Sequence, residues 1–401
     1  MSQKRPELLI PASSLEVLKT AVMFGADAVY IGGEAFGLRA KAKNFSMEDM
    51  KKGVEFAHAH GVKVHVTVNI LAHNDDLPGV EEYLKELKEV GPDALIIADP
   101  GVFELAKEIC PEIQRHVSTQ ANNTNSRVVS ARELSLREIK EIRERIPAEM
   151  EIESFIHGAM CISYSGRCLL SNFFTGRDAN QGACTHPCRW KYSIVEETRP
   201  GEYMPVYENE RGTYIFNSKD LCMIEHIPEM IDAGIDSFKI EGRMKTALYV
   251  ATVARTYRKA IDDYLEDPQK YRDNMPWYLD QISNCTYRQF TTGFYFGKPT
   301  EESQIYDSNT YVKEYTYLGI VGEICDGRCK IEQRNKFSVG ETIEIMKPDG
   351  ENVEVTVKRI INEEGEDQES APHSKQVLYI ELEGGQASPY DILRRQEPEV
   401  Q

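Results

Sequence analysis

Short apolar segments alternate with amphipathic helical patterns between residues 7 and 242, and this alternation limits the possible folds. Each apolar segment is a nearly continuous run, which is typical of strands buried on both faces of a parallel sheet. Repeated β–α units predict an α/β fold, and their number favours a TIM-like (β/α)8 barrel. The expected strands are ELLIPA (7–12), DAVYIGG (27–33), KVHVTVN (63–69), DALIIADP (93–100), IQRHVST (113–119), RVVSARE (127–133), EIESFIHG (151–158), YIFNSKD (214–220) and DSFKIEG (236–242).

The helical segments have recognisable start signals. Ser46 with Asp49, and Ser135 with Glu138, stand at the spacing of N-terminal caps. A doubly wound open sheet is the competing architecture. Because no G-x-G-x-x-G follows the first expected strand, a dinucleotide-binding fold of that kind is disfavoured.

Two features depart from a regular barrel. Nine strand candidates compete for eight places, so we expect one of the last three to be an insertion strand. In addition, only Gln120 to Asn125 or so separates the fifth and sixth candidates, whereas a parallel crossover usually needs at least about 10–12 residues. Either this connection lacks its helix or one strand is misplaced.

The pattern changes in the last quarter of the chain. A helix over 249–267 is followed by a polar, proline-containing stretch. From about residue 311 the pattern changes to short alternating strands separated by Gly and Asp turns, namely YLGIVGEI, RCKIEQ, ETIEIMKP, NVEVTVKRI and QVLYIELEG. Such strands predict a small antiparallel β-barrel. We therefore expect two domains, a TIM-like barrel over 1–300 with a cysteine-rich insert at about 158–213, and a C-terminal β-barrel over 311–395.

Composition narrows the class of protein. The net charge of −18, from 47 basic and 65 acidic residues, argues against a general affinity for polyanions but allows a local basic groove. The N-terminus lacks a signal-peptide pattern, and no apolar run is long enough to span a membrane. We expect a cytoplasmic location, where thiols stay reduced, so clustered cysteines indicate metal binding or catalysis.

Four cysteines, Cys161, Cys168, Cys184 and Cys188, follow the C-x6-C-x15-C-x3-C spacing. The first lies three residues beyond EIESFIHG, at the strand end where barrel enzymes keep their chemistry. Only the last pair fits the spacing of structural zinc. Iron–sulfur ligation tolerates the irregular spacing and is favoured over zinc; unrelated buried or surface thiols remain an alternative. The other five, Cys110, Cys222, Cys285, Cys325 and Cys329, are expected to be structural.

The segment ESFIHGAMCISYSGRCLLS resembles the signature of the collagenase-like peptidase family U-32, E-x-F-x-x-G-[SA]-x-C-x(6)-C-x-x-S. The matching residues are Glu153, Phe155, Gly158, Ala159, Cys161, Cys168 and Ser171. Further segments, including STQANNTN, GACTHPCRWKY, YIFNSKDL and DSFKIEGRMK, are similar to family segments, so the resemblance covers nearly the whole chain. Between Thr124 and Val128 the chain departs from the family, which usually has a longer segment with a helix there.

This resemblance implies RNA hydroxylation more than proteolysis. One branch of the family forms 5-hydroxyuridine at the tRNA wobble position, another forms 5-hydroxycytidine in ribosomal RNA, and prephenate is implicated in place of molecular oxygen. The NSKDL and EGRMK segments resemble the tRNA branch. Related proteins hold a 4Fe-4S cluster on four cysteines, which implies that Cys161, Cys168, Cys184 and Cys188 are cluster ligands. We therefore expect tRNA and prephenate as partners, and a paralogous family member as a further one.

Polar residues gather at the expected carboxyl ends of the strands, where a barrel active site forms. The catalytic candidates are Arg39, Asn69, Gln120, Glu133, His157, Lys219, Glu241 and Arg243. Because Arg binds carboxylates in a bidentate manner, we hypothesise that Arg39 and Arg243 bind the two carboxylates of prephenate. For each residue, a solvated loop position or a rim ion pair is the alternative.

Basic and aromatic side chains are mixed within the cysteine-rich insert. An unstacked base prefers such a surface, so we expect RNA contacts here, with packing around the cluster as the alternative. The RNA-binding candidates are Arg167, Phe173, Phe174, Arg177, Arg189, Trp190 and Lys191.

A collagenase-like peptidase is the alternative function, and a non-catalytic scaffold that needs a family partner is a third. The chain contains neither H-E-x-x-H nor G-x-S-x-G. A Cys161–His157 pair could act as nucleophile and base, but Cys161 is better used as a metal ligand. His58 and His60 do not share a helix face, which argues against a metal site formed by these two with His65.

Overall fold

The structure is a computed structural model. It describes residues 4–36, 44–118, 127–160, 170–176, 185, 187, 208–209, 212–213, 219–285, 289–299 and 315–397.

Eight parallel strands among the described residues form a closed barrel, which confirms the predicted TIM-like fold. β11 pairs with both β7 and β1, and this double pairing closes the ring. In order around the barrel the strands are β1 (Glu7–Pro11), β2 (Ala28–Gly32), β3 (Lys63–Val68), β4 (Ala94–Ile97), β5 (Gln114–Val117), β6 (Arg127–Val129), β7 (Glu151–Ala159) and β11 (Ser237–Ile240).

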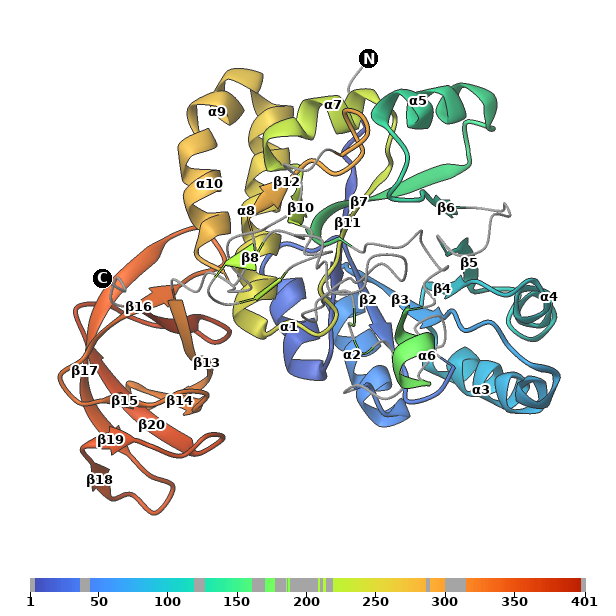
Figure 1. Cartoon of the computed structure of the whole chain (residues 1–401). Helices are drawn as coiled ribbons and strands as arrows, with labels where there is room; N and C mark the ends of the chain where they lie inside the picture. The colour runs from blue at the N-terminus through green and yellow to red at the C-terminus, as the bar shows by residue number, and fades with distance from the viewer. Residues whose placement is uncertain are drawn as a thin grey trace, which may run out of the picture.

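Helices surround these strands (Figure 1). Outward-facing residues such as Leu8, Ile10, Val64 and Val66 pack against them and form the main hydrophobic core. The helices and short 3-10 turns of the barrel are α1 (Leu15–Met23), α2 (Met47–Ala59), η1 (Asn74–Asp76), α3 (Leu77–Val90), α4 (Pro100–Ile109), α5 (Leu136–Arg145), α6 (Leu170–Thr175), η4 (Ile224–His226), α7 (Ile227–Asp232) and α8 (Ala247–Glu266).

The predicted caps are present. The Ser46 side chain accepts a hydrogen bond from the Asp49 amide, and Ser135 and Glu138 form a reciprocal capping box at the start of α5. These contacts satisfy backbone amides that the first turn of a helix leaves unpaired. They explain why short polar sequence signals located the beginnings of α2 and α5 correctly.

The extra strand lies outside the barrel, as expected. β10 (Asp220–Cys222) runs antiparallel to β7 on the outer side of the ring, and β12 (Phe290–Thr291) pairs with β10. The described strand begins at Asp220, at the end of the expected strand 214–220; residues 214–218 lie outside the described residues. β8 (Glu208–Asn209) and β9 (Gly212–Thr213) form a separate two-stranded sheet.

The pairing of the fifth and sixth strands shows whether one of them was misplaced. β5 and β6 pair in parallel, with His116 opposite Arg127, so neither strand was misplaced. Only residues 118–126 connect them, and 119–126 lie outside the described residues. β6 ends at Val129, so the expected strand 127–133 was too long.

The C-terminal domain is antiparallel, as predicted, and has its own apolar core. Six strands pair in the order β16-β21-β13-β14-β20-β17, and β17 also pairs with β16, which closes a small barrel. Its strands are β13 (Tyr315–Cys325), β14 (Arg328–Glu332), β15 (Phe337–Ser338), β16 (Thr342–Met346), β17 (Asn352–Ile361), β18 (Asp367–Gln368), β19 (Ser370–Ala371), β20 (Val377–Glu383) and β21 (Ile392–Gln396). β21 was not expected from the sequence.

The C-terminal domain packs against α8 and lies near α10 (Met275–Ser283), whereas α9 (Pro268–Asp273) lies beside α8 at the end away from this domain (Figure 1). Tyr317, Met346 and Ile392 of this domain belong to the main core of the large barrel. The Arg255 guanidinium of α8 donates to the Lys347 carbonyl and to Asn352 Oδ1, both at 2.9 Å. The two domains therefore share buried apolar and polar contacts. None of the described helices combines the length and apolar character that crossing a bilayer requires.

Candidate functional site

The interior of the large barrel is unusually polar. TIM barrels usually fill this space with branched apolar side chains. Here Leu9, Ala28, Tyr30 and Ile96 form a small apolar cluster of their own, separate from the main core. Residues paired across neighbouring strands point to the same side of the sheet. The register therefore extends this inner surface to buried polar residues, namely His65 beside Tyr30, His116 beside Ile96, Arg127 beside His116, and Lys239 beside Leu9.

Charged groups in the interior are paired. Glu153 Oε1 lies 2.5 Å from Lys239 Nζ, and Glu153 Oε2 lies 3.3 Å from Arg127 Nη1. Arg127 also pairs with Glu7 at 2.5 Å and with Glu151 at 2.6 Å. Burial opposes the Arg127 charge, but its hydrogen bond with Glu7 and the nearby carboxylates outweigh burial and raise its pKa. This network compensates the buried charges, which would otherwise be costly.

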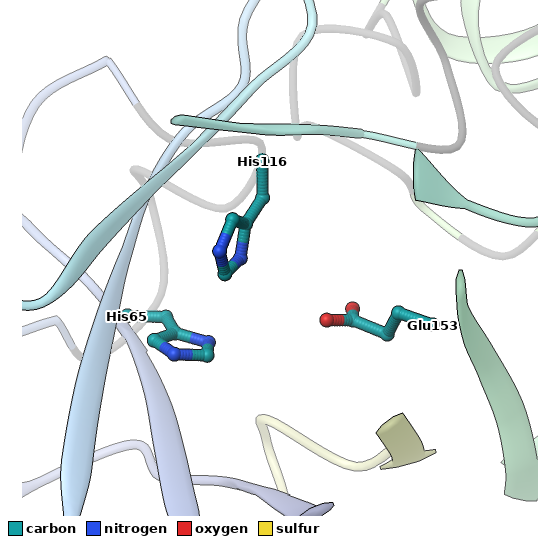
Figure 2. A group of neighbouring side chains, drawn as sticks. All are labelled: His65, His116 and Glu153. Atoms are coloured by element: carbon teal, nitrogen blue, oxygen red, sulfur yellow. The ribbon is translucent and has the colours of Figure 1, made fainter. Parts of the chain in front are cut away.

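Two histidines meet in the same space. The rings of His65 and His116 lie 4.7 Å apart, nearly perpendicular at 86°, and Figure 2 shows them pointing toward each other with the Glu153 carboxylate close by. Burial and the positive charge of Arg127 lower the pKa of His116 to about 3. Burial and the neighbouring His116 lower the pKa of His65 well below its usual value. Both rings are therefore neutral at pH 7.

Arg243 lies at the carboxyl end of the barrel, where catalysis was expected. Its Nη1 donates to Thr67 Oγ1 at 2.8 Å, and Thr67 in turn donates to the Ile31 carbonyl. A Cβ at position 32 would lie 2.6 Å from Arg243 Nη1, so the absence of a side chain at Gly32 makes room for the guanidinium. The structure thus places a nearly buried cation across the ends of β2 and β3.

Glu241 belongs to the same end of the barrel. The Tyr30 hydroxyl lies 2.9 Å from the Ile240 carbonyl and 3.3 Å from Glu241 Oε2. The chain around Glu241 passes so close to β7 that a Cβ at position 158 would lie 2.4 Å from the Glu241 carbonyl oxygen. Gly158 also has a positive φ of 114°, which favours glycine. The glycine of the family signature is therefore explained by this contact.

The other described candidates lie in different surroundings. Asn69 follows β3 directly, and Glu133 lies in the connection between β6 and α5, both half-buried. Lys219 precedes Asp220, which is paired with Ala159, so Lys219 lies near the carboxyl end of β7. The His157 side chain lies 3.4 Å from the Tyr257 hydroxyl and packs near Phe290, which places it on the side of β7 that faces α8 and β12. Burial lowers the pKa of His157 to about 3.

Many predicted site residues lie outside the described residues. These are the catalytic candidates Arg39 and Gln120, the cysteines Cys161, Cys168, Cys184 and Cys188, and the RNA-binding candidates Arg167, Arg177, Arg189, Trp190 and Lys191. Of the RNA-binding candidates, Phe173 and Phe174 on α6 are described. Phe173 is 82% exposed and meets Phe174 edge-to-face at 5.2 Å.

Neighbours of the four cysteines are described and allow a test of their fit to a cluster. β7 ends at Ala159, two residues before Cys161 in the sequence. Ser171 Oγ accepts a hydrogen bond from the Thr185 amide at 3.1 Å and lies 3.0 Å from Thr185 Oγ1. Ser171 follows Cys168 by three residues in the sequence, and Thr185 directly follows Cys184. These bonds therefore join described neighbours of two of the four cysteines.

The remaining cysteines are mostly buried. Cys110, Cys222, Cys285 and Cys329 are buried free thiols, whereas Cys325 is exposed on the β13–β14 hairpin. Burial raises the pKa of Cys222 to about 11 and that of Cys285 to about 12. Buried, protonated thiols are poor nucleophiles, which agrees with the structural role expected of these residues.

Sequence reasoning missed His116, Arg127 and Lys239 as a group with His65. One signal was present, because a polar residue recurs at every second position of KVHVT and QRHVS. This period of two marks the inward face of a strand. The same period occurs on half-exposed strands, so only the register of the closed barrel distinguishes the two cases.

Comparison with known proteins identifies the family. Residues 13–305 match the family model described as Peptidase family U32, and residues 313–394 match the Peptidase family U32 C-terminal domain. The chain is 42% identical over 394 residues to tRNA hydroxylation protein P1 of Bacillus subtilis (strain 168), covering 95% of this chain and 92% of that protein. It is 37% identical over 449 residues to tRNA hydroxylation protein P of Escherichia coli (strain K12), covering 98% and 97%.

The alignment with a third relative covers a smaller share of both chains. The 23S rRNA 5-hydroxycytidine C2501 synthase of Escherichia coli (strain K12) is 38% identical over 279 residues, which is 67% of this chain and 41% of that protein. The first family model alone spans well over half of the chain, and the predicted resemblance is confirmed. The chain belongs to peptidase family U32.

Proposed function

We propose that this protein hydroxylates tRNA. The observation that carries the proposal is the likeness, over nearly the full length of both chains, to proteins named for tRNA hydroxylation. The relative named for ribosomal RNA modification shares only 41% of its own length with this chain. The region shared with the two tRNA hydroxylation proteins includes both the large barrel and the C-terminal domain. A tRNA substrate is therefore favoured over ribosomal RNA.

The specific reaction that we propose is the conversion of a wobble uridine to 5-hydroxyuridine, with prephenate in place of molecular oxygen. Prephenate carries two carboxylates, and a guanidinium is their natural bidentate partner. Arg243 supports this assignment, because its hydrogen bond to Thr67 holds the guanidinium at the carboxyl end of the barrel. The lack of a side chain at Gly32 leaves room for it there. Arg39 is assigned to the second carboxylate from its place after the second strand.

The proposed cofactor is a 4Fe-4S cluster on Cys161, Cys168, Cys184 and Cys188, with zinc as the less favoured alternative. The Ser171–Thr185 hydrogen bonds support this assignment because they join the segments that carry two of these thiols. A bound cluster would supply a redox centre beside the barrel mouth. Around it, Lys219 and Glu241 lie at the same end of the barrel and can orient or exchange protons with a bound substrate.

RNA contact is assigned to α6 and the neighbouring basic residues of the insert. The exposed Phe173 ring offers a free face for stacking an unpaired base, an interaction worth about 1–3 kcal/mol. The family name leaves a peptidase as the alternative. The described histidines of the barrel do not favour it, because His65, His116 and His157 are each only 1% exposed and a peptide could not reach them.

Nucleoside mass spectrometry of tRNA tests the proposal. In a strain that lacks this gene and its paralogues, 5-hydroxyuridine should disappear and return with the wild-type gene. A gene with all four insert cysteines changed to serine should fail to restore it. Iron and sulfide analysis of protein purified without oxygen should give about four of each per chain for a 4Fe-4S cluster. Unchanged 5-hydroxyuridine in the deletion strain would refute the tRNA assignment.

A further inference from the structure

We propose that His65, His116 and Glu153 bind a divalent transition-metal ion inside the barrel, at a site separate from the four insert cysteines. One donor atom from each of the three residues lies within 4.8 Å of the others. The residues come from β3, β5 and β7, and Figure 2 shows their side chains converging on one space. This proposal does not depend on the proposed tRNA reaction.

Unpaired ring nitrogens provide independent support for the site. Among the described residues, both nitrogens of His116 and the Nδ1 atom of His65 are buried without a hydrogen-bond partner. Each ring is only 1% exposed. Buried polar atoms are nearly always satisfied, and leaving one unsatisfied costs about 1–3 kcal/mol. A neutral imidazole nitrogen with a free lone pair is also the commonest metal ligand in proteins. A metal ion in this space would therefore pair one nitrogen of each ring.

The donor types select the class of ion. Two imidazole nitrogens and one carboxylate suit zinc or ferrous iron, whereas calcium and magnesium prefer all-oxygen sites. Metal–ligand bonds of about 2.0–2.2 Å place tetrahedral donors about 3.4 Å apart. The present separation of up to 4.8 Å is larger, so binding requires small side-chain rotations. Because all three residues lie on strands of a closed barrel, their backbone positions are already set.

The charges around Glu153 determine how the ion would bind. Lys239 Nζ lies 2.5 Å from Glu153 Oε1 and so compensates the carboxylate in the structure as it stands. An ion on Glu153 must therefore compete with this ammonium group. Lys239 has an alternative position nearby, since its Nζ already lies 4.6 Å from the Tyr30 ring and 5.4 Å from the Phe155 ring. Arg127 remains paired with Glu7 and Glu151 when Glu153 turns to the ion.

Competition between the metal ion and the Lys239 ammonium for Glu153 predicts how substitutions change metal affinity. Removing the ammonium while keeping a similar shape should strengthen metal binding, whereas removing the imidazoles should abolish it. Lys239→Gln should lower the Kd for Zn²⁺ at least about tenfold, which corresponds to about 1.4 kcal/mol. A merely structural salt bridge between Lys239 and Glu153 would not produce tighter metal binding when it is broken.

The test uses the full-length protein with all four insert cysteines changed to serine, so that the insert thiols cannot account for bound metal. The protein is incubated with Zn²⁺ or Fe²⁺ without oxygen, desalted and analysed for metal. We expect about one ion per chain, lost in His65→Gln/His116→Gln and retained in the exposed control His60→Gln. Circular dichroism checks that each variant is folded. Absence of metal from the folded parent, or unchanged metal in the double-histidine variant, would overturn the proposal.

Cobalt provides a readout that needs no histidine variant. Co²⁺ bound to the four-serine variant should show d–d absorption without sulfur-to-cobalt charge transfer. If this variant does not fold, the same Zn²⁺ measurement is made on the wild-type protein. The zinc content of wild type is then compared with that of two variants. We expect it to be higher in Lys239→Gln and lower in His65→Gln/His116→Gln. Equal zinc content in all three proteins would refute the site.

Discussion

The Nη1 atom of Arg243 occupies the space that a side chain at Gly32 would fill, 2.6 Å from the ideal Cβ position. Thr67 accepts a hydrogen bond from the same nitrogen at 2.8 Å. The sequence positions of the three residues are far apart, yet the barrel brings them together at the ends of β2, β3 and β11. A guanidinium held in this way is oriented before any carboxylate arrives, which reduces the entropy lost on binding.

Gly32→Ala should therefore impair substrate use without unfolding the protein. The methyl group displaces the far end of the Arg243 side chain, which can rotate away at little cost in stability. We expect the KM for the proposed substrate prephenate to rise about 10- to 150-fold, as a lost charged hydrogen bond of about 1.5–3 kcal/mol implies. Arg243→Ala should have a similar effect. The measurement is the rate of 5-hydroxyuridine formation on tRNA at varied prephenate concentration.

Two controls accompany this prediction. Gly322→Ala adds a methyl group where the nearest atom is an ordinary 3.4 Å away, in the C-terminal domain, and should leave KM unchanged. The visible absorption of the proposed cluster should be the same in Gly32→Ala and in Arg243→Ala as in the wild-type protein. Loss of the cluster in either variant would contradict a role limited to holding the carboxylate.

The stability of the protein should fall as the solution becomes acidic, and His157 should contribute. Burial lowers its folded-state pKa to about 3, whereas an unfolded histidine titrates near 6.5. Below about pH 6.5 the unfolded chain therefore binds a proton that the folded chain does not, so acid favours unfolding. One such histidine contributes a slope of up to about 1.4 kcal/mol per pH unit between these two pKa values.

His157→Gln keeps a polar group near the Tyr257 hydroxyl and removes the titration. Urea unfolding of the variant between pH 5 and pH 8 should show a shallower loss of stability than wild type. Above about pH 7.5 the two free-energy curves should run parallel, because neither state takes up the proton there. Identical slopes below pH 6 would show that His157 is not held neutral by burial.

The parts of the fold that were predictable are those in which local pattern and burial agree. ALII (94–97) is apolar over its whole length because both faces of its strand are covered, and this is visible without a structure. β21 was missed because ILRRQ contains two arginines. One of them, Arg394, is fully buried against the Tyr315 ring and beside Glu344, which no local pattern reveals.

The site was predictable only at the ends of strands. Glu241 lies near the end of the expected strand 236–242 and Arg243 directly follows it, so their place at the barrel mouth follows from the fold class. His116 and Lys239 lie within strands, and the direction of a side chain there depends on register, which a shift of one residue would reverse. His157 shows the same limit, since a register irregularity between Lys239 and Ile240 accompanies its pairing to β11.

Arg255 should couple the two domains energetically. Its guanidinium donates to Lys347 and Asn352 of the C-terminal domain and to Gln281 Oε1 at 2.5 Å. Burial, with the positive charge of Arg394, lowers its pKa to about 10, so it stays charged at pH 7. Arg255→Ala leaves these buried acceptors unpaired and should cost about 2–4 kcal/mol.

Urea unfolding followed by two signals checks this prediction. We expect the midpoint to fall and the tryptophan signal, which includes Trp277 beside Arg255, to separate from the signal of total secondary structure. Arg359→Ala is the matched control, because Arg359 pairs with Asp367 at the exposed surface of the C-terminal domain. A single, unshifted transition in Arg255→Ala would show that the apolar contacts of Tyr317, Met346 and Ile392 alone join the domains.

Phe173 should matter for tRNA binding and little for folding. The ring is 82% exposed, so Phe173→Ala removes few packing contacts and should leave the melting temperature nearly unchanged. If a base stacks on this ring, the variant loses about 1–3 kcal/mol of binding free energy, which weakens the Kd for tRNA about 5- to 150-fold. Phe296→Ala is the control, since Phe296 is also exposed (55%) but packs beside His226.

Salt dependence separates stacking from charge in the same experiment. Phosphate contacts weaken steeply as salt rises, whereas a stacking contact does not release counterions. The ratio of the Kd values of Phe173→Ala and wild type should therefore stay constant between low and moderate salt, while both values rise. A ratio that approaches one at higher salt would assign the effect to displaced basic residues of the insert. Equal Kd values at every salt concentration would remove Phe173 from the RNA interface altogether.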